Sequence, residues 1–503
     1  MSLRYPYFIL FLLFFACQKT DRYAAPNLEA PDPAQLDAFI RENVEQTGQF
    51  LWEWASNEQV WTAIANTDYV MSVGYRPAGA VGVEDRLHLI DIAEAEWLEA
   101  RQKVLDMTLA SERRLNPSLK EADLFAFEEN GVLPVMNLYV RNPETIALLR
   151  ASDYVRYAEP TAYEPYCTQP KDRSGGSGCG GNTPEYGLST PADYLNIAPG
   201  CKQSWNHAYH NIAQAWGNST GSGVSIAYID TGASDDQENL GQDFAQGYSA
   251  GRYIEKYVTL PKTNNGPNET PNDLCGHGTS MIGAGAAPRG SDGAAVGIAY
   301  GANVVSIRAA ADVYLDESRE VTGVSNAFVL AGNHGGVRII SMSMGRINSS
   351  SQISDAVKFA YGKNKMIFCA AGTSFWWSAW FAGVIFPANM AEAIAVTGIR
   401  DNLTSRCGNC HSGSKVDFVL VMQKNSNGRV PLSLADYGDT PSTVGGSSVA
   451  TASTAGIAAL VWAKYPGWTR TQVFNRLKSS ANYFPNRHSQ FGWGRINAQT
   501  ATQ

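Results

Sequence analysis

Three short motifs, far apart in this 503-residue chain, each place one polar side chain among small residues. Residues 228–232 read Tyr-Ile-Asp-Thr-Gly and centre on Asp230, residues 275–280 read Cys-Gly-His-Gly-Thr-Ser and carry His277, and residues 446–451 read Gly-Ser-Ser-Val-Ala-Thr. An isolated Asp, His or Ser is usually a cap, a turn or a solvated side chain. An Asp, a His and a Ser that all lie at strand ends or helix starts indicate a fold in which these ends come together. Open α/β sheets do this at their carboxyl edge.

The chain from about residue 205 onward alternates expected strands and helices. Strand candidates are residues 224–229, 303–307, 337–340 and 393–399. This alternation predicts an α/β fold with a mainly parallel sheet and helices on both faces. No internal repeat is evident, and the length suggests two to four domains.

Each of the three polar side chains has a position that suits a chemical role. Asp230 ends an apolar strand, and His277 opens a helix of small residues. At a helix N-terminus the dipole favours the neutral imidazole that a general base needs, so we expect His277 to stay neutral. Ser448 begins the apolar helix 449–464, and its hydroxyl needs an adjacent base to act as a nucleophile. The adjacent Ser447 lies in the same motif and is the alternative candidate for the nucleophile.

The motifs and their order, Asp then His then Ser, resemble those of the subtilisin-like serine proteases. Residues 446–450 resemble the family's Gly-Thr-Ser-x-Ala pattern, which assigns the nucleophile to Ser448. The resemblance implies a subtilisin-like three-layer domain and a serine endopeptidase that forms an acyl-enzyme. In that scheme Ser448 attacks the peptide carbonyl, His277 carries the proton and Asp230 orients His277.

The same resemblance assigns the walls of a peptide-binding cleft. One wall is an edge to which an extended peptide adds as a strand, and the other lies opposite; the six residues are Ser343, Met344, Gly345, Ala370, Ala371 and Gly372. The family then has an oxyanion-binding Asn, whose loss in subtilisin lowers turnover about 100- to 1000-fold, whereas this chain has Thr373. We expect Thr373 and the Ser448 N–H to hold the oxyanion in an active but slow or selective enzyme. A catalytically weak or inactive surface binding protein with this fold is the alternative.

The first 17 residues have the pattern of a bacterial lipoprotein signal. Arg4 precedes a short apolar run at residues 7–16, and Ala16 followed by Cys17 resembles a lipobox, in which the cysteine is lipidated. The run is too short for a transmembrane helix, and no later stretch is expected to be long and apolar enough. We therefore expect export from a bacterial cytoplasm and lipid anchoring to the cell envelope or outer membrane, or release after maturation. Ordinary secretion with cleavage near Cys17 is the alternative.

Four segments follow the signal. We expect a tether and helical region at 18–65, a small α+β (ferredoxin-like) domain at 66–165, a Gly-rich linker at 166–200 and the catalytic domain at 201–503. The strand, helix and strand that end at residues 155–160 resemble the close of a subtilase inhibitory propeptide. The resemblance implies a zymogen that is cut in the linker, and an unrelated small α/β domain is the alternative.

Eight cysteines fit an oxidising compartment. Cys17 is assigned to lipidation, and Cys369 lies in an apolar run and is expected to be a buried free thiol. The six disulfide candidates are a local pair, Cys407 with Cys410, and four residues of open connectivity, Cys167, Cys179, Cys201 and Cys275. Cys407 to His411 also spells a c-type haem attachment pattern, but no His or Met context suggests a haem pocket, so we favour the disulfide over haem or metal.

The net charge of −8 and the lack of a Lys/Arg run argue against nucleic acid as a partner. The expected partners are polypeptide substrates, the chain's own propeptide as an intramolecular inhibitor, and the membrane through an N-terminal lipid only. No metal site and no cofactor are expected for catalysis. Structural calcium is left open, because no acidic loop has convincing ligand spacing.

Overall fold

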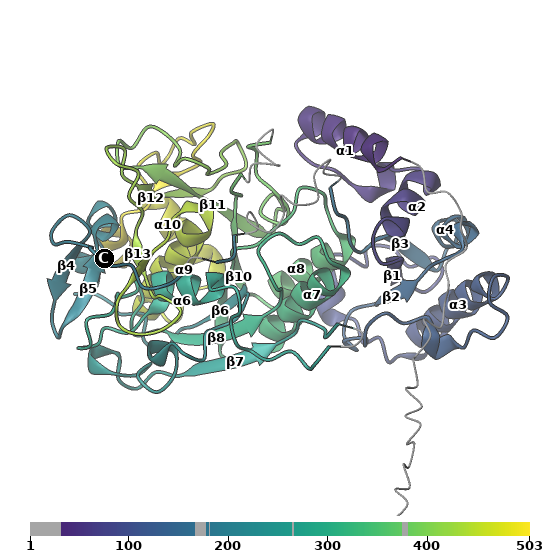
Figure 1. Cartoon of the computed structure of the whole chain (residues 1–503), viewed down its shortest axis with the longest axis horizontal. Coiled ribbons are helices and arrows are strands. Elements are labelled where there is room, and N and C mark those ends of the chain that lie inside the picture. The colour runs from purple at the N-terminus through teal and green to yellow at the C-terminus, as the bar shows by residue number, and fades with distance from the viewer. Residues whose placement is uncertain (1–31, 166–177, 181, 264–265, 375–380) are drawn as a thin grey trace, which may run out of the picture.

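The larger part of the chain is built around one eight-stranded parallel sheet (Figure 1). The structure is a computed structural model that describes residues 32–165, 178–180, 182–263, 266–374 and 381–503. Every neighbouring pair of strands in this sheet is parallel, which confirms the fold class predicted from the sequence. From one edge to the other the strands are β15 (Gly494–Arg495), β12 (Phe418–Gln423), β11 (Ala393–Arg400), β10 (Met366–Ala370), β9 (Val337–Met342), β6 (Ser225–Asp230), β8 (Asn303–Arg308) and β7 (Ile254–Val258).

Alternate side chains of the central strands enter two different cores. In β6, Ile226 and Tyr228 pack on one face of the sheet, whereas Ala227 and Ile229 pack on the other. Successive strand residues point to opposite faces, so a strand that is covered on both sides must be apolar throughout. This explains why the central strands were recognisable as continuous apolar runs.

Helices cover both faces of the sheet. On one face lie α6 (His277–Ala286) and α9 (Gly446–Lys464), and on the other lie α7 (Ser318–Asn333) and α8 (Ser351–Gly362). By length and composition α9 meets the requirements of a membrane span, contrary to the expectation that no stretch after the signal would do so. However, 83% of its apolar window is buried inside the protein, so α9 is a core helix.

The N-terminal part has its own three-stranded antiparallel sheet in the order β2-β1-β3. A single antiparallel bridge between Phe125 and Leu138 lies beside β2, where a fourth strand would complete a ferredoxin-like sheet. The preceding residues form a 3-10 turn (Glu121–Asp123), which leaves little extended chain for that strand. The elements of this part are β1 (Val70–Tyr75), β2 (Val135–Tyr139), β3 (Val155–Pro160), α1 (Pro33–Thr47), α2 (Asn57–Ala65), α3 (Ala95–Glu112) and α4 (Pro143–Arg150).

Local sequence accounts for two of these helices. In α4 the Pro is in the first turn, where its missing N–H is harmless, and the side chain of Asn142 caps the helix by accepting the Glu144 N–H at 3.1 Å. In α1 the buried residues are Leu36, Ile40 and Val44, at the spacing of four that places them on one helical face. Both helices were expected from the sequence, and α2 lies at the end of the region 18–65 that was expected to be a tether and helical.

The N-terminal sheet docks on α8, and Figure 1 shows its strands beside α7 and α8. Arg156 of β3 pairs with Asp355 of α8 at 2.6 Å, and their side chains are only 2% and 3% exposed. The carboxylate of Glu159, also in β3, accepts the N–H of Ser351 at 2.5 Å and its hydroxyl at 2.8 Å. One hydrophobic core runs from the N-terminal helices into α7 and α8.

The remaining elements are short or peripheral. The hairpin of β4 and β5 begins inside the segment expected to be a linker, so the expectation of a loop up to residue 200 is wrong at its end. Each residue of β4 pairs with one residue of β5, from Tyr194 with Ser204 to Ile197 with Cys201, which fixes the register of the hairpin without a long sequence signal. These elements are β4 (Tyr194–Ile197), β5 (Cys201–Ser204), β13 (Leu432–Ser433), β14 (Ser442–Thr443), α5 (Ile212–Ala215), α10 (Arg470–Ser479) and α11 (Ala498–Thr502).

Candidate active site

Asp230 and His277 form a hydrogen-bonded pair at the carboxyl edge of the large sheet. Asp230 is the last residue of β6 and is 2% exposed, and His277 is the first residue of α6. The Nδ1 atom of His277 lies 2.7 Å from Oδ1 of Asp230. When Nδ1 donates its proton to this carboxylate, Nε2 of the neutral ring is left as the acceptor that a general base requires.

A further carboxylate, Asp273, fixes the chain on both sides of this pair. Its Oδ1 accepts the Thr231 hydroxyl at 2.9 Å, and its Oδ2 accepts both the N–H and the hydroxyl of Thr279 at 2.8 Å. Asp273 thereby ties the end of β6 to the first turn of α6. The approach also needs glycine, because a Cβ on Gly278 would collide with the carbonyl oxygen of Gly232.

The pKa of His277 is shifted by burial and by the carboxylates around the ring. Burial is the largest influence and lowers its pKa, but the charge and hydrogen bond of Asp230, with smaller contributions from Asp273 and Asp312, together raise the pKa above 6.5. The three carboxylates therefore outweigh the burial of the ring. The pKa of His277 is raised, which is the opposite direction to the shift that we expected from the helix dipole.

Ser448 lies in the first turn of α9 and is tied to the chain that follows β9. Its hydroxyl donates to the carbonyl of Ser343 at 3.3 Å, and the Ser343 hydroxyl donates to the carbonyl of Ser448 at 3.0 Å. Among the residues that the structure describes, Ser448 makes no hydrogen bond to His277. The contact between nucleophile and base is therefore not formed in this state, and the triad stays a prediction.

The strand register nevertheless places the two halves of the site side by side. β9 is a parallel neighbour of β6, and their register puts Ser343, the first residue after β9, next to Asp230. Neighbouring strands are about 5 Å apart. The Asp230–His277 pair and the Ser343–Ser448 pair therefore leave adjacent strand ends at the same edge of the sheet.

Thr373 lies against the start of α9. Its Oγ1 is 3.0 Å from the hydroxyl oxygen of Ser447, and either group can be the donor. A Cβ on Gly446 would come within 3.3 Å of Thr373 Oγ1, so the Thr373 side chain faces the segment that carries Ser448. The hydroxyl of Thr373 is thus near the expected nucleophile and shares a hydrogen bond with Ser447.

A cavity of about 50 Å³ opens beside Ser448. Ala371 is outside its lining, because it is buried and donates its N–H to the carbonyl of Val396 at 2.8 Å. The other five residues expected to form the walls of the cleft do line the cavity, together with Thr373: Ser343, Met344, Gly345, Ala370 and Gly372.

The edge at Gly345 is already paired. Its N–H donates to the carbonyl of Val313, and its carbonyl accepts the N–H of Leu315, both at 3.2 Å. A peptide that adds to this edge as a strand must replace these two bonds. The edge expected to receive substrate is therefore closed at Gly345 in this state.

The sequence reasoning missed five residues that line the cavity: Val313, Tyr314, Ile347, Ile385 and His411. Val313 and Tyr314 follow the end of β8, so the rule that sites gather beyond strand ends pointed to them. His411 stood out only as the last residue of a haem-like pattern. Residues 375–380, in the aromatic segment after Thr373, lie outside the described residues.

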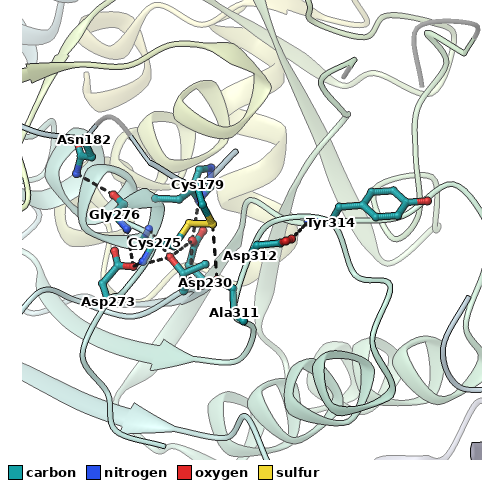
Figure 2. Close-up of a disulfide and its surroundings, with 12 residues drawn as sticks. Cys179, Asn182, Asp230, Asp273, Cys275, Gly276, Ala311, Asp312 and Tyr314 are labelled. Atoms are coloured by element: carbon teal, nitrogen blue, oxygen red, sulfur yellow. Dashed lines mark hydrogen bonds and ion pairs between the residues drawn. A yellow bond between two sulfur atoms is a disulfide. The ribbon is translucent and has the colours of Figure 1, made fainter. Parts of the chain in front are cut away.

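A disulfide between Cys179 and Cys275 lies next to the His277 segment (Figure 2). It joins residues 96 positions apart. Beside it Gly180 donates its N–H to the Cys275 carbonyl at 3.1 Å, and the side chain of Asn182 donates to the Gly276 carbonyl at 2.8 Å. The segment after the expected propeptide is thus fastened to the chain that leads into α6.

The other cysteines agree in part with the sequence expectations. Cys407 and Cys410 form the predicted local disulfide, and Cys369 is the predicted buried free thiol. Cys201 is also a buried free thiol, so its assignment as a disulfide candidate is corrected: its side chain packs in the core on the α9 face. The lipidation candidate Cys17 and the disulfide candidate Cys167 lie outside the described residues.

The Asp–His pair and the serine at the carboxyl edge of a parallel sheet suit a hydrolase of the serine class, and comparison with known proteins identifies the family. The model of peptidase family S8, the subtilase family, matches residues 221–494. The chain is 26% identical over 452 residues to "Alkaline elastase YaB" of Bacillus sp. (strain YaB), covering 89% of this chain and 100% of that protein. It is 30% identical over 288 residues to "Subtilisin Savinase" of Lederbergia lenta, covering 56% of this chain and 92% of that protein.

The chain therefore belongs to the subtilase family and is a serine-type endopeptidase that acts on polypeptides. Among solved structures it is similar to MycP1 from Mycobacterium smegmatis, with 20% identity and a TM-score of 0.48, over 65% of this chain and 92% of that one. Subtilases need no cofactor for catalysis. In the part of the chain that the structure describes, no three His, Cys, Asp or Glu residues are grouped to hold a metal ion, and structural calcium stays open.

Proposed function

We propose that the protein is an exported serine endopeptidase, made as a zymogen, whose triad is Asp230, His277 and Ser448. The observation that carries this proposal is the 2.7 Å hydrogen bond between Asp230 and His277. The end of the neighbouring strand carries Ser343, whose carbonyl accepts the Ser448 hydroxyl. Ser448 Oγ attacks the peptide carbonyl while His277 takes its proton, and His277 then protonates the leaving amine. Water hydrolyses the acyl-enzyme by the same route, and Asp230 stabilises the imidazolium throughout.

Substrate binding offers a route from the present contact of Ser448 to the catalytic one. A peptide that adds to a strand edge donates backbone N–H groups to the carbonyls of that edge. When the Ser343 carbonyl receives such an N–H, Ser448 Oγ loses its present acceptor and turns to Nε2 of His277. Catalytic hydrogen bonds in other enzymes also tighten only in the complex. Peptide binding would then align the nucleophile.

Thr373 and the Ser448 N–H are the proposed oxyanion donors. If Ser447 donates to Thr373 Oγ1 across their 3.0 Å contact, the Thr373 proton is released to point at the developing charge. Donors that are fixed before the reaction stabilise that charge most, because they need no reorganisation. The two hydroxyls together would replace the Asn that the family uses.

Labelling with a fluorophosphonate probe tests this function. Matured wild-type protein should be labelled, Ser448→Ala should not, and the neighbouring variant Ser447→Ala is the matched control that should keep its label. Labelling that survives Ser448→Ala and disappears in Ser447→Ala would assign the nucleophile to the other serine. His277→Ala should abolish labelling as well, because the hydroxyl then has no base.

The second candidate is a surface binding protein with this fold and little or no catalytic activity. Two observations favour it: Thr373 stands where the family has Asn, and the edge at Gly345 is paired with Val313 and Leu315. This candidate predicts that Ser448 is unlabelled even after the N-terminal unit has been removed. Rapid labelling of matured protein would exclude it.

The zymogen proposal assigns residues 66–165 to an inhibitory propeptide, 166–200 to the maturation linker and 201–503 to the catalytic domain. Its support is the buried contact of β3 with α8 and the reach of the following chain toward the cleft. Arg346, the residue after the cleft wall at Gly345, donates to the carbonyl of Thr161 at 3.1 Å. Mass spectrometry of mature protein should find an N-terminus between about residues 160 and 205, and none there in Ser448→Ala.

Lipid anchoring belongs to the same proposal and concerns residues before the described part. The apolar run and the Ala16–Cys17 junction support an anchor of the envelope or outer membrane. Radiolabelled palmitate should be incorporated by bacteria that express the wild type but not by those that express Cys17→Ser. Equal incorporation by both would contradict the lipobox, and the protein would then be secreted without an anchor.

A further inference from the structure

A buried histidine lines the cavity beside Ser448 but has no part in the proposed mechanism. His411 is 2% exposed. Its Nδ1 lies 2.8 Å from the carbonyl of Gly383, which can only accept, so Nδ1 carries the proton. Its Nε2 lies 2.9 Å from the hydroxyl of Ser374, which must then donate to it. Both ring nitrogens are satisfied, and neither needs a substrate group.

The position of this ring is fixed by the loop that carries it. His411 follows the Cys407–Cys410 disulfide, and its N–H donates to the carbonyl of Gly372 at 2.9 Å. The ring packs directly behind Gly372, where a Cβ would collide with Nδ1. Its hydroxyl-bearing neighbour Thr397 donates to the His411 carbonyl at 2.6 Å. The imidazole is therefore held in one position against Gly372, the residue before Thr373.

The cavity is suited to an uncharged side chain. Burial, with a smaller effect of Arg406, lowers the pKa of His411 to about 4, so the ring is neutral at neutral pH. Among the described residues that line the cavity there is no Asp, Glu, Lys or Arg, and several are apolar, such as Met344 and Ile385. A charged side chain placed there would lose its hydration without gaining a partner, which is strongly unfavourable.

The cavity also limits the size of that side chain. Its volume of about 50 Å³ is roughly three to five times the ~10–15 Å³ that one water molecule needs. Three or four carbon atoms, as in Val or Leu, fit this space. An aromatic ring or a long basic side chain does not fit without displacing a wall.

The location of the cavity identifies which substrate side chain enters it. Its lining includes the nucleophile Ser448, the oxyanion residue Thr373 and the strand edge at Ser343. A peptide that lies along this edge with a carbonyl at Ser448 directs the side chain of that same residue into the cavity. The cavity is thus the pocket for the residue on the acyl side of the cut bond.

Building on the proposed function, we propose that His411 is a specificity-determining residue that sets the depth of this pocket, so that the protease cuts after Val or Leu. The ring closes the pocket as a neutral wall. Removing it would deepen the pocket without touching the triad, and larger side chains would then be accepted.

Kinetics on a set of peptides tests the preference. Matured wild-type protein is assayed with succinyl-Ala-Ala-Pro-Xaa p-nitroanilides in which Xaa is Val, Leu, Phe or Lys. We expect kcat/KM for Val or Leu to exceed that for Phe and for Lys at least tenfold. Faster cleavage after Phe or Lys would overturn the inference while leaving the proposed protease intact. Failure to cleave any of the four, together with no fluorophosphonate labelling, would overturn the proposed function and this inference with it.

Two pocket variants and one control test the role of His411. His411→Ala should raise the ratio of kcat/KM for Phe over Val at least tenfold, mainly through KM. Ile385→Ala enlarges the pocket at another wall residue and should shift the ratio in the same direction, which keeps the test valid if His411→Ala does not fold. His334→Ala, which removes a histidine bound to Glu255 outside the cavity, should leave the ratio unchanged. A uniform fall for all four peptides in both pocket variants would mean a merely structural role.

Discussion

The first turn of α9 carries two serines whose hydroxyls have different partners. Ser447 shares a hydrogen bond with Thr373, and Ser448 donates to the carbonyl of Ser343. The buried Ser447 is thus turned toward the expected oxyanion site, whereas Ser448 faces the strand edge where a peptide would bind. This division supports Ser448 as the nucleophile and gives Ser447 a supporting role.

Thr373 is expected to limit the rate. Thr373→Val keeps the shape but removes the hydroxyl, so we expect kcat to fall about tenfold or more, while Thr373→Asn restores the family's donor and should raise kcat about tenfold. Steady-state kinetics on one peptide measures both. If Thr373→Asn lowered kcat as much as Thr373→Val does, Thr373 would have a role other than oxyanion binding.

The carboxylates around His277 should govern the acidic limb of the pH profile. Asp312 helps to raise the pKa of His277, and a general base works only when it is neutral. Removing that charge lowers the pKa, so Asp312→Asn should move the rise of kcat/KM to lower pH and leave the plateau nearly unchanged. Asp236→Asn, at an exposed position, is the matched control. A shift toward higher pH would contradict the electrostatic assignment.

At the scale of elements, the sequence predicts what is encoded locally. The strands β6, β8 and β11 match the expected ranges to within one residue, because apolar runs are local signals. The helix α4 precedes β3 as expected, and its Pro at the first turn and its Asn cap are local signals as well. The pairing of the Gly345 edge and the placement of His411 behind Gly372 depend on chain segments far apart in sequence. No local pattern contains them, so the closed edge and the pocket wall could not be foreseen.

The contact between β3 and α8 should depend on one buried ion pair. Arg156→Met leaves the buried Asp355 with the Tyr157 hydroxyl but without its charged partner, and loss of one partner of a buried ion pair costs about 3–5 kcal/mol. In an unprocessed Ser448→Ala background, we expect a clearly lower midpoint of thermal unfolding. Arg114→Met breaks an exposed pair with Glu144, 62% and 66% exposed, and should cost less than about 1 kcal/mol. Equal effects of the two changes would contradict the importance of the buried pair.

At the scale of the whole molecule, the two parts of the chain are joined by a shared core and by buried polar contacts. The core that begins in α1 and α2 continues into α7 and α8. A disulfide also joins Cys179, in the expected linker, to Cys275 in the catalytic part. A cut between residues 165 and 179 would therefore leave the new N-terminus fastened beside His277. Only the number of cysteines, and not this pairing, was readable from the sequence.

The contact between the N-terminal part and the catalytic part should become less stable as the pH rises toward neutrality. Burial raises the pKa of Glu159 from 4.5 to about 7, with Asp355 adding to the rise and with the Ser351 bonds and Arg346 opposing it. Because the folded pKa is above the unfolded one, the stability from this group is full below about pH 4.5 and is lost as the pH passes 7, a change of about 3 kcal/mol. Full-length protein with Ser448→Ala alone should be compared with the same protein that also carries Glu159→Gln. Between pH 5 and pH 8 the free energy of unfolding of the first should fall relative to that of the second. The exposed change Glu144→Gln should not alter the pH dependence, and a wild-type advantage that grows with pH would contradict the assignment.

The most direct measurement is a crystal structure of matured protein after reaction with a fluorophosphonate. We predict phosphorus bonded to Oγ of Ser448, with that oxygen within about 2.6–3.2 Å of Nε2 of His277, and a phosphonyl oxygen in contact with the Ser448 N–H. Phosphorus on another residue, or a Ser448 side chain that still lies beyond hydrogen-bonding distance of His277, would contradict the proposed triad.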